Sequence, residues 1–315
     1  MRTFVGLFTL SLLASCGAAP VSETLSDHEW LENMVRYHGY DASEVGLALG
    51  VSAEEAAVRV EAANVPVGFA PKDGAGRIRV VPYPGGRHPR IGFLEGAIDP
   101  HRDTKFSAFL PWEREGYVVV DLPEAIWGVE PGREPELQYL AHTHIPTVWD
   151  RKQVKLDHVE WKRQGAQLVG ERVFPNGLEF RTRVTPTADF VDMEMTLRNG
   201  TEIPLSGLRT QICVMLKGAP SFNDQTNDNK ELLEADRIAA ARSKDGKRWI
   251  LTIWERSKPW GNKDCPCIHA DPVFPDLKPG AGSTVRGRLF FVEGEDLESA
   301  IDGYRRAGLL EFGPS

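Results

Sequence analysis

The chain has 315 residues, of which 41% are hydrophobic and 26% are charged, and its formal net charge is −8. This length is sufficient for one large or two modest domains with a sizeable core. Because contact with nucleic-acid phosphates requires a basic face, the negative charge argues against nucleic acid as a partner.

The N-terminal residues predict export. Arg2 precedes an apolar segment at 4–14, which has the length of a secretory h-region and is too short for a stable membrane span. The segment ends in Leu13-Ala14-Ser15-Cys16, which resembles the lipobox of bacterial lipoproteins. This resemblance implies removal of residues 1–15, a lipid on Cys16, and anchoring in the periplasm or at the outer membrane. The alternative is an ordinary cleaved signal peptide with an incidental cysteine.

Helical periodicity follows within residues 27–65. Ser52 with Glu55 three residues later has the pattern of a capping box, so a second helix is expected after a short turn. Helix, turn and helix together suggest DNA binding. The segment 53–63, however, carries three Glu and one Arg, and would repel a phosphate backbone. We therefore predict that residues 16–70 form a helical module that packs on the main domain or spaces it from the membrane.

From about Arg77 the hydrophobic period changes to two. In segment 190–197, Val, Met, Met and Leu alternate with Asp, Glu and Thr. Roughly a dozen segments of this kind are separated by turn dipeptides such as Asn176-Gly177 and Asn199-Gly200. With almost no helix between them, they predict that residues 71–315 form a large antiparallel β-sandwich. An amphipathic segment at 296–308 predicts a C-terminal helix.

The segment 189-DFVDMEMTLRNGTEIPLSGLRTQ-211 resembles a stretch of galactose-mutarotase-like proteins. In that family a long strand ends in an Asn-Gly or Asn-x-Thr turn, a Pro-Leu pair follows, and the next strand returns across a concave sheet. The resemblance implies an antiparallel supersandwich whose concave face holds a carbohydrate. The same fold carries epimerases, polysaccharide lyases, glycoside hydrolases and non-catalytic modules, so fold alone does not decide function.

Two histidines lie two residues apart in the expected strand 137–144. Side chains at i and i+2 of a strand share a face, so His142 and His144 are expected to point the same way. They could bind one metal, act as general acid or base, or donate to sugar hydroxyls. The alternative is a polar sheet face with two satisfied histidines. The candidates that follow in the sequence are Trp149 and Asp150, then His158 and Glu160 on the expected strand 157–163.

The cysteines of the chain are candidates for metal binding. Three cysteines remain after Cys16 and cannot all pair, and Cys213 lies in an apolar run that predicts a buried thiol. Cys265, Cys267 and His269 alternate in a loop and could bind Zn²⁺ or copper. The alternative is a proline-rich loop held by local packing.

Two further segments carry potential sugar contacts. The segment 217–230 is rich in amides and carboxylates that suit sugar hydroxyls or Ca²⁺, although these side chains also form local Asx turns. In the segment 99–113, basic side chains could pair with uronate or sulfate groups, and tryptophan rings could stack on sugars.

Three functions remain open: a carbohydrate-active enzyme, a non-catalytic glycan-binding module, and a metal-binding surface protein. A lyase would use His142 or His144 as base and Arg209 to stabilise the enolate. A hydrolase would use two carboxylates, such as Asp150 and Glu160. The expected catalytic residues are His142, His144, Glu160 and Arg209. The expected substrate-binding residues are Arg102, Lys105, Trp112, Trp149, Asp150, Gln211, Asn223, Gln225, Asn227 and Asp228. The expected ligands of a divalent metal, Zn²⁺ or Ca²⁺, include Cys265, Cys267 and His269.

Overall fold

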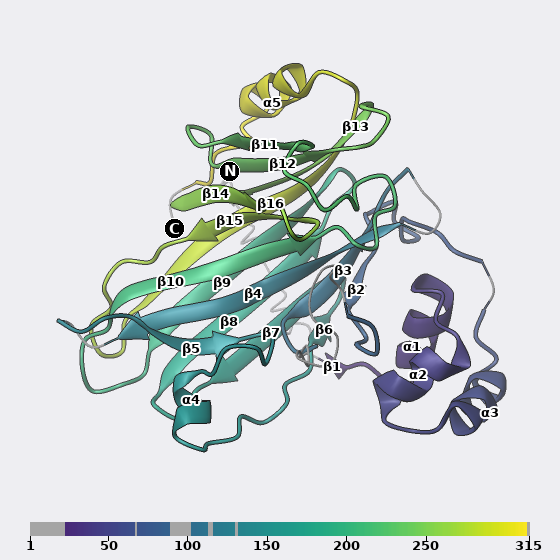
Figure 1. The fold of residues 1–315 in the computed structure, drawn as a ribbon, viewed down its shortest axis with the longest axis horizontal. Coiled ribbons are helices and arrows are strands. Elements are labelled where there is room, and N and C mark those ends of the chain that lie inside the picture. Colours follow the sequence, from purple (N-terminus) through teal and green to yellow (C-terminus); the bar gives the residue numbers. More distant parts are fainter. Residues whose placement is uncertain (1–22, 67, 89–101, 113–115, 130–131, 314–315) are drawn as a thin grey trace, which may run out of the picture.

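Segments in which apolar and polar residues alternate form two antiparallel sheets (Figure 1). The structure is a computed structural model, and it describes residues 23–66, 68–88, 102–112, 116–129 and 132–313. The nine-stranded sheet contains, in spatial order, β1 (Glu23–Thr24), β6 (Lys162–Gln164), β7 (Gln167–Val173), β8 (Leu178–Pro186), β9 (Phe190–Asn199), β16 (Gly282–Glu293), β13 (Arg248–Trp254), β12 (Ile238–Arg242) and β11 (Lys230–Leu233). The seven-stranded sheet contains β14 (Ser257–Asn262), β15 (Cys267–Pro272), β10 (Ser206–Met215), β4 (Tyr117–Val129), β3 (Lys105–Phe109) and β2 (Val80–Pro82), with β5 (Glu136–Leu140) paired to β4.

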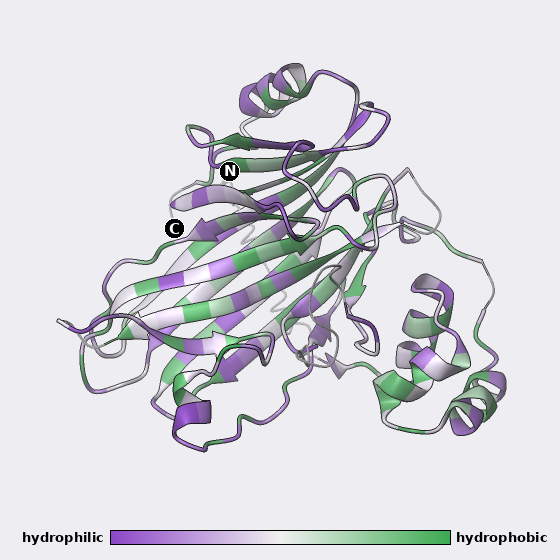
Figure 2. Cartoon of the chain, in the orientation of Figure 1, coloured by the Kyte–Doolittle hydropathy of each residue, from purple (hydrophilic) through white to green (hydrophobic). Residues whose placement is uncertain are grey.

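The main core lies between the two sheets. Along β9, the four apolar residues Val191, Met193, Met195 and Leu197 are fully buried, and they belong to one cluster with Val120 and other residues of β4 and β10. The polar residues between them point to the other face, as a period of two requires. Figure 2 shows the same alternation along β4 and β10. The predicted antiparallel sandwich is confirmed.

In the described part of the chain, six helical segments accompany the sheets. The N-terminal module consists of α1 (Asp27–Glu32), the π-helix η1 (Asn33–Tyr37), α2 (Ala42–Leu49) and α3 (Ala53–Ala63), and it has a small core of its own. As the sequence predicts, Ser52 caps α3 by accepting a hydrogen bond from the backbone N–H of Glu55. The short helix α4 (Val148–Arg151) follows β5, and α5 (Leu297–Arg306) packs on the outer face of β12, β13 and β16. Among the described residues, no helix is long and apolar enough to span a membrane.

The helical module is attached to the seven-stranded sheet through His38. Its Nε2 lies 2.7 Å from Ser107 Oγ on β3, and its Nδ1 lies 2.9 Å from the carbonyl oxygen of Asn33. Burial lowers the pKa of His38 to about 3, so the ring is neutral at ordinary pH. Four aromatic rings contact the imidazole edge-on: Tyr40, Tyr83, Phe109 and Tyr117.

Candidate active site

The candidate site lies where the pairing along one edge of β4 changes partner. β3 pairs with residues 117–121 of β4, and β5 pairs with residues 125–128. Between these two stretches, the N–H of Leu122 donates to Thr104 and the N–H of Ala141 donates to Glu124. This break in the ladder gathers the start of β3, the middle of β4 and the segment after β5.

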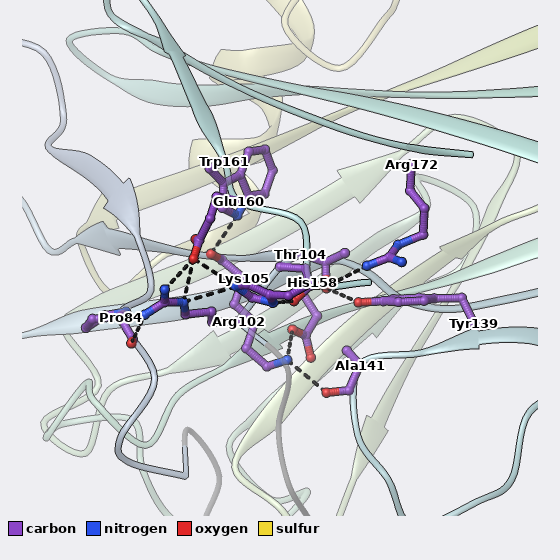
Figure 3. A network of polar contacts seen from close by, with 12 residues as sticks. Pro84, Arg102, Thr104, Lys105, Tyr139, Ala141, His158, Glu160, Trp161 and Arg172 are labelled. Atoms are coloured by element: carbon purple, nitrogen blue, oxygen red, sulfur yellow. Dashed lines mark hydrogen bonds and ion pairs between the residues drawn. The ribbon is translucent and has the colours of Figure 1, made fainter. Parts of the chain in front are cut away.

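Four ionisable side chains meet at this break, and we call them the inner cluster: Lys105, Asp121, Glu124 and His142. Lys105 Nζ lies 3.1 Å from Asp121 Oδ1 and donates to the carbonyl of Ala141 (Figure 3). His142 Nε2 lies 3.5 Å from Asp121 Oδ2 and 3.5 Å from Glu124 Oε1. No member of the cluster is more than 3% exposed, so these charges interact in a poorly hydrated environment.

Asp121 is held as a carboxylate within the inner cluster. Burial raises its pKa, but the positive charge of Lys105 and the hydrogen bond from His142 outweigh burial and lower the pKa below its usual value. An ionised carboxylate beside an imidazole holds the ring in one orientation. The cluster therefore positions an imidazole, a side chain type that can act as general acid or base.

A pocket of about 630 Å³ opens from His142 toward the segment that follows α4. Tyr139 and Trp149 provide apolar walls, while Asp150 and His158 are among its polar lining residues. This volume lies within the roughly 300–1,000 Å³ that small-molecule sites occupy. The pocket combines aromatic surface with hydrogen-bonding groups, which is the pairing that sugar rings require.

A second group of charges adjoins the pocket, and we call it the outer network: Arg102, Asp103, His158, Glu160 and Arg172. Of these, Asp103, His158 and Arg172 line the pocket. His158 Nδ1 lies 2.6 Å from Asp103 and its Nε2 lies 2.8 Å from Glu160. Arg172 pairs with Asp103, and Arg102 pairs with Glu160 (Figure 3). The hydrogen bonds to Asp103 and Glu160 raise the pKa of His158 to about 9, so this half-exposed ring carries a positive charge at neutral pH.

A row of residues in register runs across the seven-stranded sheet from the inner cluster, away from the pocket. Across β3, β4, β10, β15 and β14, the residues in register are Lys105, Asp121, Cys213, His269 and Trp260. Glu124 Oε2 lies 3.8 Å from His269 Nδ1, and this contact joins the inner cluster to a group of sulfur and imidazole donors. Two sets of three residues each bring their potential metal-binding atoms within 4.8 Å of one another: Asp121, Glu124 and His142, and Cys213, Cys267 and His269.

The two expected histidines do not form a strand pair. The strand ends at Leu140, and both residues lie in the bend that follows, so the prediction of a shared strand face is wrong. The ring of His142 is 1% exposed and faces two carboxylates, whereas His144 is exposed with its ring centroid 5.9 Å away. The expected strand 157–163 also starts later, since β6 begins at Lys162. His158 and Glu160 are therefore positioned by their ion pairs and not by a sheet.

The expected sugar contacts near the pocket have separate structural roles. Lys105 is fully buried against Asp121, and Arg102 and Glu160 pair with each other. Asp150 caps the start of α4 by accepting from Thr147, although it also lines the pocket. Trp149 forms part of the pocket wall. Trp112 packs against core rings of Phe222 and Phe291. Residues 99–101 and 113 of that segment lie outside the described residues, as does Cys16.

The remaining expected residues lie away from the pocket. Arg209 and Gln211 are on β10, and the guanidinium of Arg209 lies over the ring of Trp127 at 5.0 Å. Within the amide-rich loop, Asn227 accepts a hydrogen bond from Lys230. The other hydrogen bonds of this loop are local or reach neighbouring loops. Gln225 donates to the carbonyl oxygen of Asp264, Asn223 accepts from Lys244, and the N–H of Asp228 donates to Thr226.

The sequence reasoning missed Asp121, Glu124 and Cys213 as members of one site. Asp121 and Glu124 are acidic residues within the long and otherwise almost entirely buried strand β4, and a charge in such a strand is a usable signal. The proximity of Cys213 could not be inferred in this way, because it depends on the register between β10 and β4.

The chain matches no protein-family model and no curated protein sequence. Its fold is similar to that of a polysaccharide lyase, BACCELL_00875 (12% identity, TM-score 0.35, 61% of this chain and 30% of the lyase). It is also similar to a putative aldose 1-epimerase from Escherichia coli K12 (11% identity, TM-score 0.38, 61% and 97%). A third similar structure is the heparan sulfate lyase HepC from Pedobacter heparinus (8% identity, TM-score 0.34, 62% and 36%). Identities this low give no information about individual site residues.

Proposed function

We propose that this chain is a carbohydrate-active enzyme that binds its substrate in the 630 Å³ pocket and transfers a proton through His142. One observation supports this proposal above the others: a buried imidazole at the pocket lies 3.5 Å from each of two carboxylates. Lys105 holds one of these carboxylates ionised. Proton transfer by a positioned imidazole contributes about 10²–10⁴-fold to a reaction rate.

The geometry favours removal of a proton from carbon, as in lyase or epimerase chemistry, over hydrolysis. His142 would accept the proton, and the carboxylates of Asp121 and Glu124 would stabilise the imidazolium that results. Lys155, His158 and Arg172 line the same pocket, and their N–H groups would donate to the carboxylate of an acidic sugar such as a uronate. An acidic sugar also acidifies the C–H bond next to its carboxylate, which is the bond that such chemistry breaks.

A non-catalytic glycan-binding module is the second candidate. The aromatic walls formed by Tyr139 and Trp149 and the polar rim would serve binding without turnover. The two candidates differ in what they require of His142, because a module needs its hydrogen bonds but not its ability to change protonation state.

The test uses purified mature protein with a panel of uronic-acid and neutral polysaccharides. Unsaturated products are followed by ultraviolet absorbance and new chain ends by a reducing-sugar assay. We expect activity on an acidic polysaccharide and a loss of about 10²-fold or more in His142→Gln. His28→Gln, which changes an exposed histidine on α1, is the matched control and should retain activity. No product from any glycan, with binding retained in affinity electrophoresis, would support the module instead.

We further propose that the protein is exported and lipid-anchored through Cys16. The support is the apolar segment 4–14 followed by the lipobox-like Leu13-Ala14-Ser15-Cys16. Expression in a bacterial host with a labelled fatty acid should label the wild-type protein and leave Cys16→Ser unlabelled. Equal labelling of both proteins, or of neither, would refute the anchor.

A further inference from the structure

We propose that Cys213, Cys267 and His269 bind a thiophilic metal ion, which we expect to be Zn²⁺. Their potential ligand atoms, two sulfurs and one imidazole nitrogen, all lie within 4.8 Å of one another. Two thiolates and an imidazole are a ligand set that zinc accepts in proteins. This inference does not depend on the proposed carbohydrate activity, and it replaces Cys265 of the sequence-based prediction with Cys213.

The backbone positions all three ligands before any metal binds. Cys213 on β10 is in direct register with His269 on β15, which places their Cβ atoms about 4.5–5.5 Å apart. Cys267 is two residues before His269 on the same strand and therefore shares its face. Both strands are paired on both sides, because β10 also contacts β4 and β15 also contacts β14. Sites built on such strands hold ligand geometry better than loop sites do.

The surroundings orient His269 as a metal ligand. Its Nε2 lies 3.3 Å from Cys267 Sγ, whereas its Nδ1 faces the carboxylates of Glu124 and Asp271, each 3.8 Å away. Asp271 is itself held by the indole N–H of Trp260 at 2.5 Å, and that ring stacks on the imidazole with centroids 3.8 Å apart. A carboxylate behind the nitrogen that does not face the metal is the usual arrangement around zinc-bound histidines.

Burial favours metal ligands over a reactive cysteine. The ammonium group of Lys230 lies beside this group of residues and donates to the carbonyl oxygen of Cys265 at 3.3 Å. Cys213, Cys267 and His269 are at most 2% exposed. A cysteine nucleophile must reach a substrate, whereas a structural metal ion is well served by a closed site.

Cys265 supplies a matched control. It is as buried as Cys267 and belongs to the same apolar cluster, yet among the described residues it is not part of the group whose donor atoms converge. Cys265→Ser should therefore cause a similar packing change without removing a ligand. Cys213→Ser and Cys267→Ser each remove one sulfur donor.

The experiment measures metal directly in the mature protein purified without chelator. We expect one equivalent of zinc in the wild type and in Cys265→Ser, and little in Cys213→Ser or Cys267→Ser. After removal of zinc, titration with Co²⁺ should give a thiolate-to-cobalt charge-transfer absorption in the wild type that weakens when either ligand cysteine is lost. The thermal midpoint of the wild type should rise with added Zn²⁺.

The proposal fails if the wild-type protein holds no stoichiometric zinc and gives no cobalt–thiolate absorption. It also fails if Cys265→Ser loses the metal as completely as Cys213→Ser does, or if thiol titration of the native protein shows Cys213 and Cys267 joined in a disulfide. Because the wild-type measurements alone can refute it, a variant that does not fold leaves the test intact. Neither readout depends on enzyme activity, so failure of the carbohydrate assay would not affect it.

Discussion

Replacement of Lys105 by methionine should destabilise the protein strongly at neutral pH. Both Lys105 and Asp121 are fully buried, and Lys105 Nζ lies 3.1 Å from the carboxylate. Methionine fills a similar volume but removes the main positive charge that compensates Asp121. Breaking a buried ion pair by removing one partner costs about 3–5 kcal/mol. For a folded chain of roughly 270 residues, that corresponds to a fall of about 5–9 °C in the thermal midpoint.

The pH dependence of this loss identifies its cause. In the wild type the pKa of Asp121 is lowered, so its contribution to stability is present above its unfolded pKa and is lost as the pH falls through the folded value. Without Lys105, burial should raise the pKa of Asp121 instead. The folded variant then binds a proton more readily than the wild type, and the difference in stability between the two should shrink as the pH is lowered.

Urea denaturation followed by tryptophan fluorescence measures the free energy of unfolding of each variant. The double variant Lys105→Met with Asp121→Asn should be less destabilised than the sum of the two single changes, because it leaves no buried charge of that pair. Arg198→Met breaks a half-exposed pair with Glu179 and should cost less than about 1 kcal/mol. A loss in Lys105→Met no larger than in Arg198→Met, or strict additivity in the double variant, would refute this reasoning.

Two other predictions concern the outer network and the sheet packing. Since the pKa of His158 is raised to about 9, its contribution to stability is complete below about pH 6.5 and is lost as the pH rises through about 9. The difference in thermal midpoint between wild type and His158→Asn should therefore shrink over that pH range. A difference that stays constant with pH would contradict this prediction. A Cβ on Gly287 would lie 2.3 Å from the buried ring of Trp254, so Gly287→Ala should cost about 1–3 kcal/mol of unfolding free energy. Gly303 in α5 has open space around it, so Gly303→Ala should raise the free energy of unfolding by about 0.5–1 kcal/mol. If chemical denaturation shows equal effects for the two glycine substitutions, the packing described is contradicted.

The architecture could be predicted from the sequence because its signals are local. The alternation along residues 190–197 indicates a strand and determines which side chains of β9 face the core. The helix starting after Ser52 is likewise determined by a cap within a few residues of it.

The candidate site could be predicted only in part, because long-range register creates it. The predicted site residue His142 lies at the pocket, but its neighbours Asp121 and Glu124 come from a strand about twenty residues earlier. The donor group joins Cys213 to His269 through pairing between β10 and β15. A single sequence does not specify which strands pair or at what offset, so the choice between Cys213 and Cys265 could not be made from spacing.

The attachment of the helical module has a consequence for how the protein unfolds. A neutral imidazole enclosed by aromatic rings joins the helices to β3, and the side-chain amide of Asn33 donates to the carbonyl oxygen of Pro82 on β2 of the same sheet. Helices this short are marginal without a partner surface, so loss of the sheet should remove the support that keeps them folded. We expect calorimetry to record a single melting transition for the helical module and the β-sandwich. The two parts, which meet near residue 70, would then not be independently folding units.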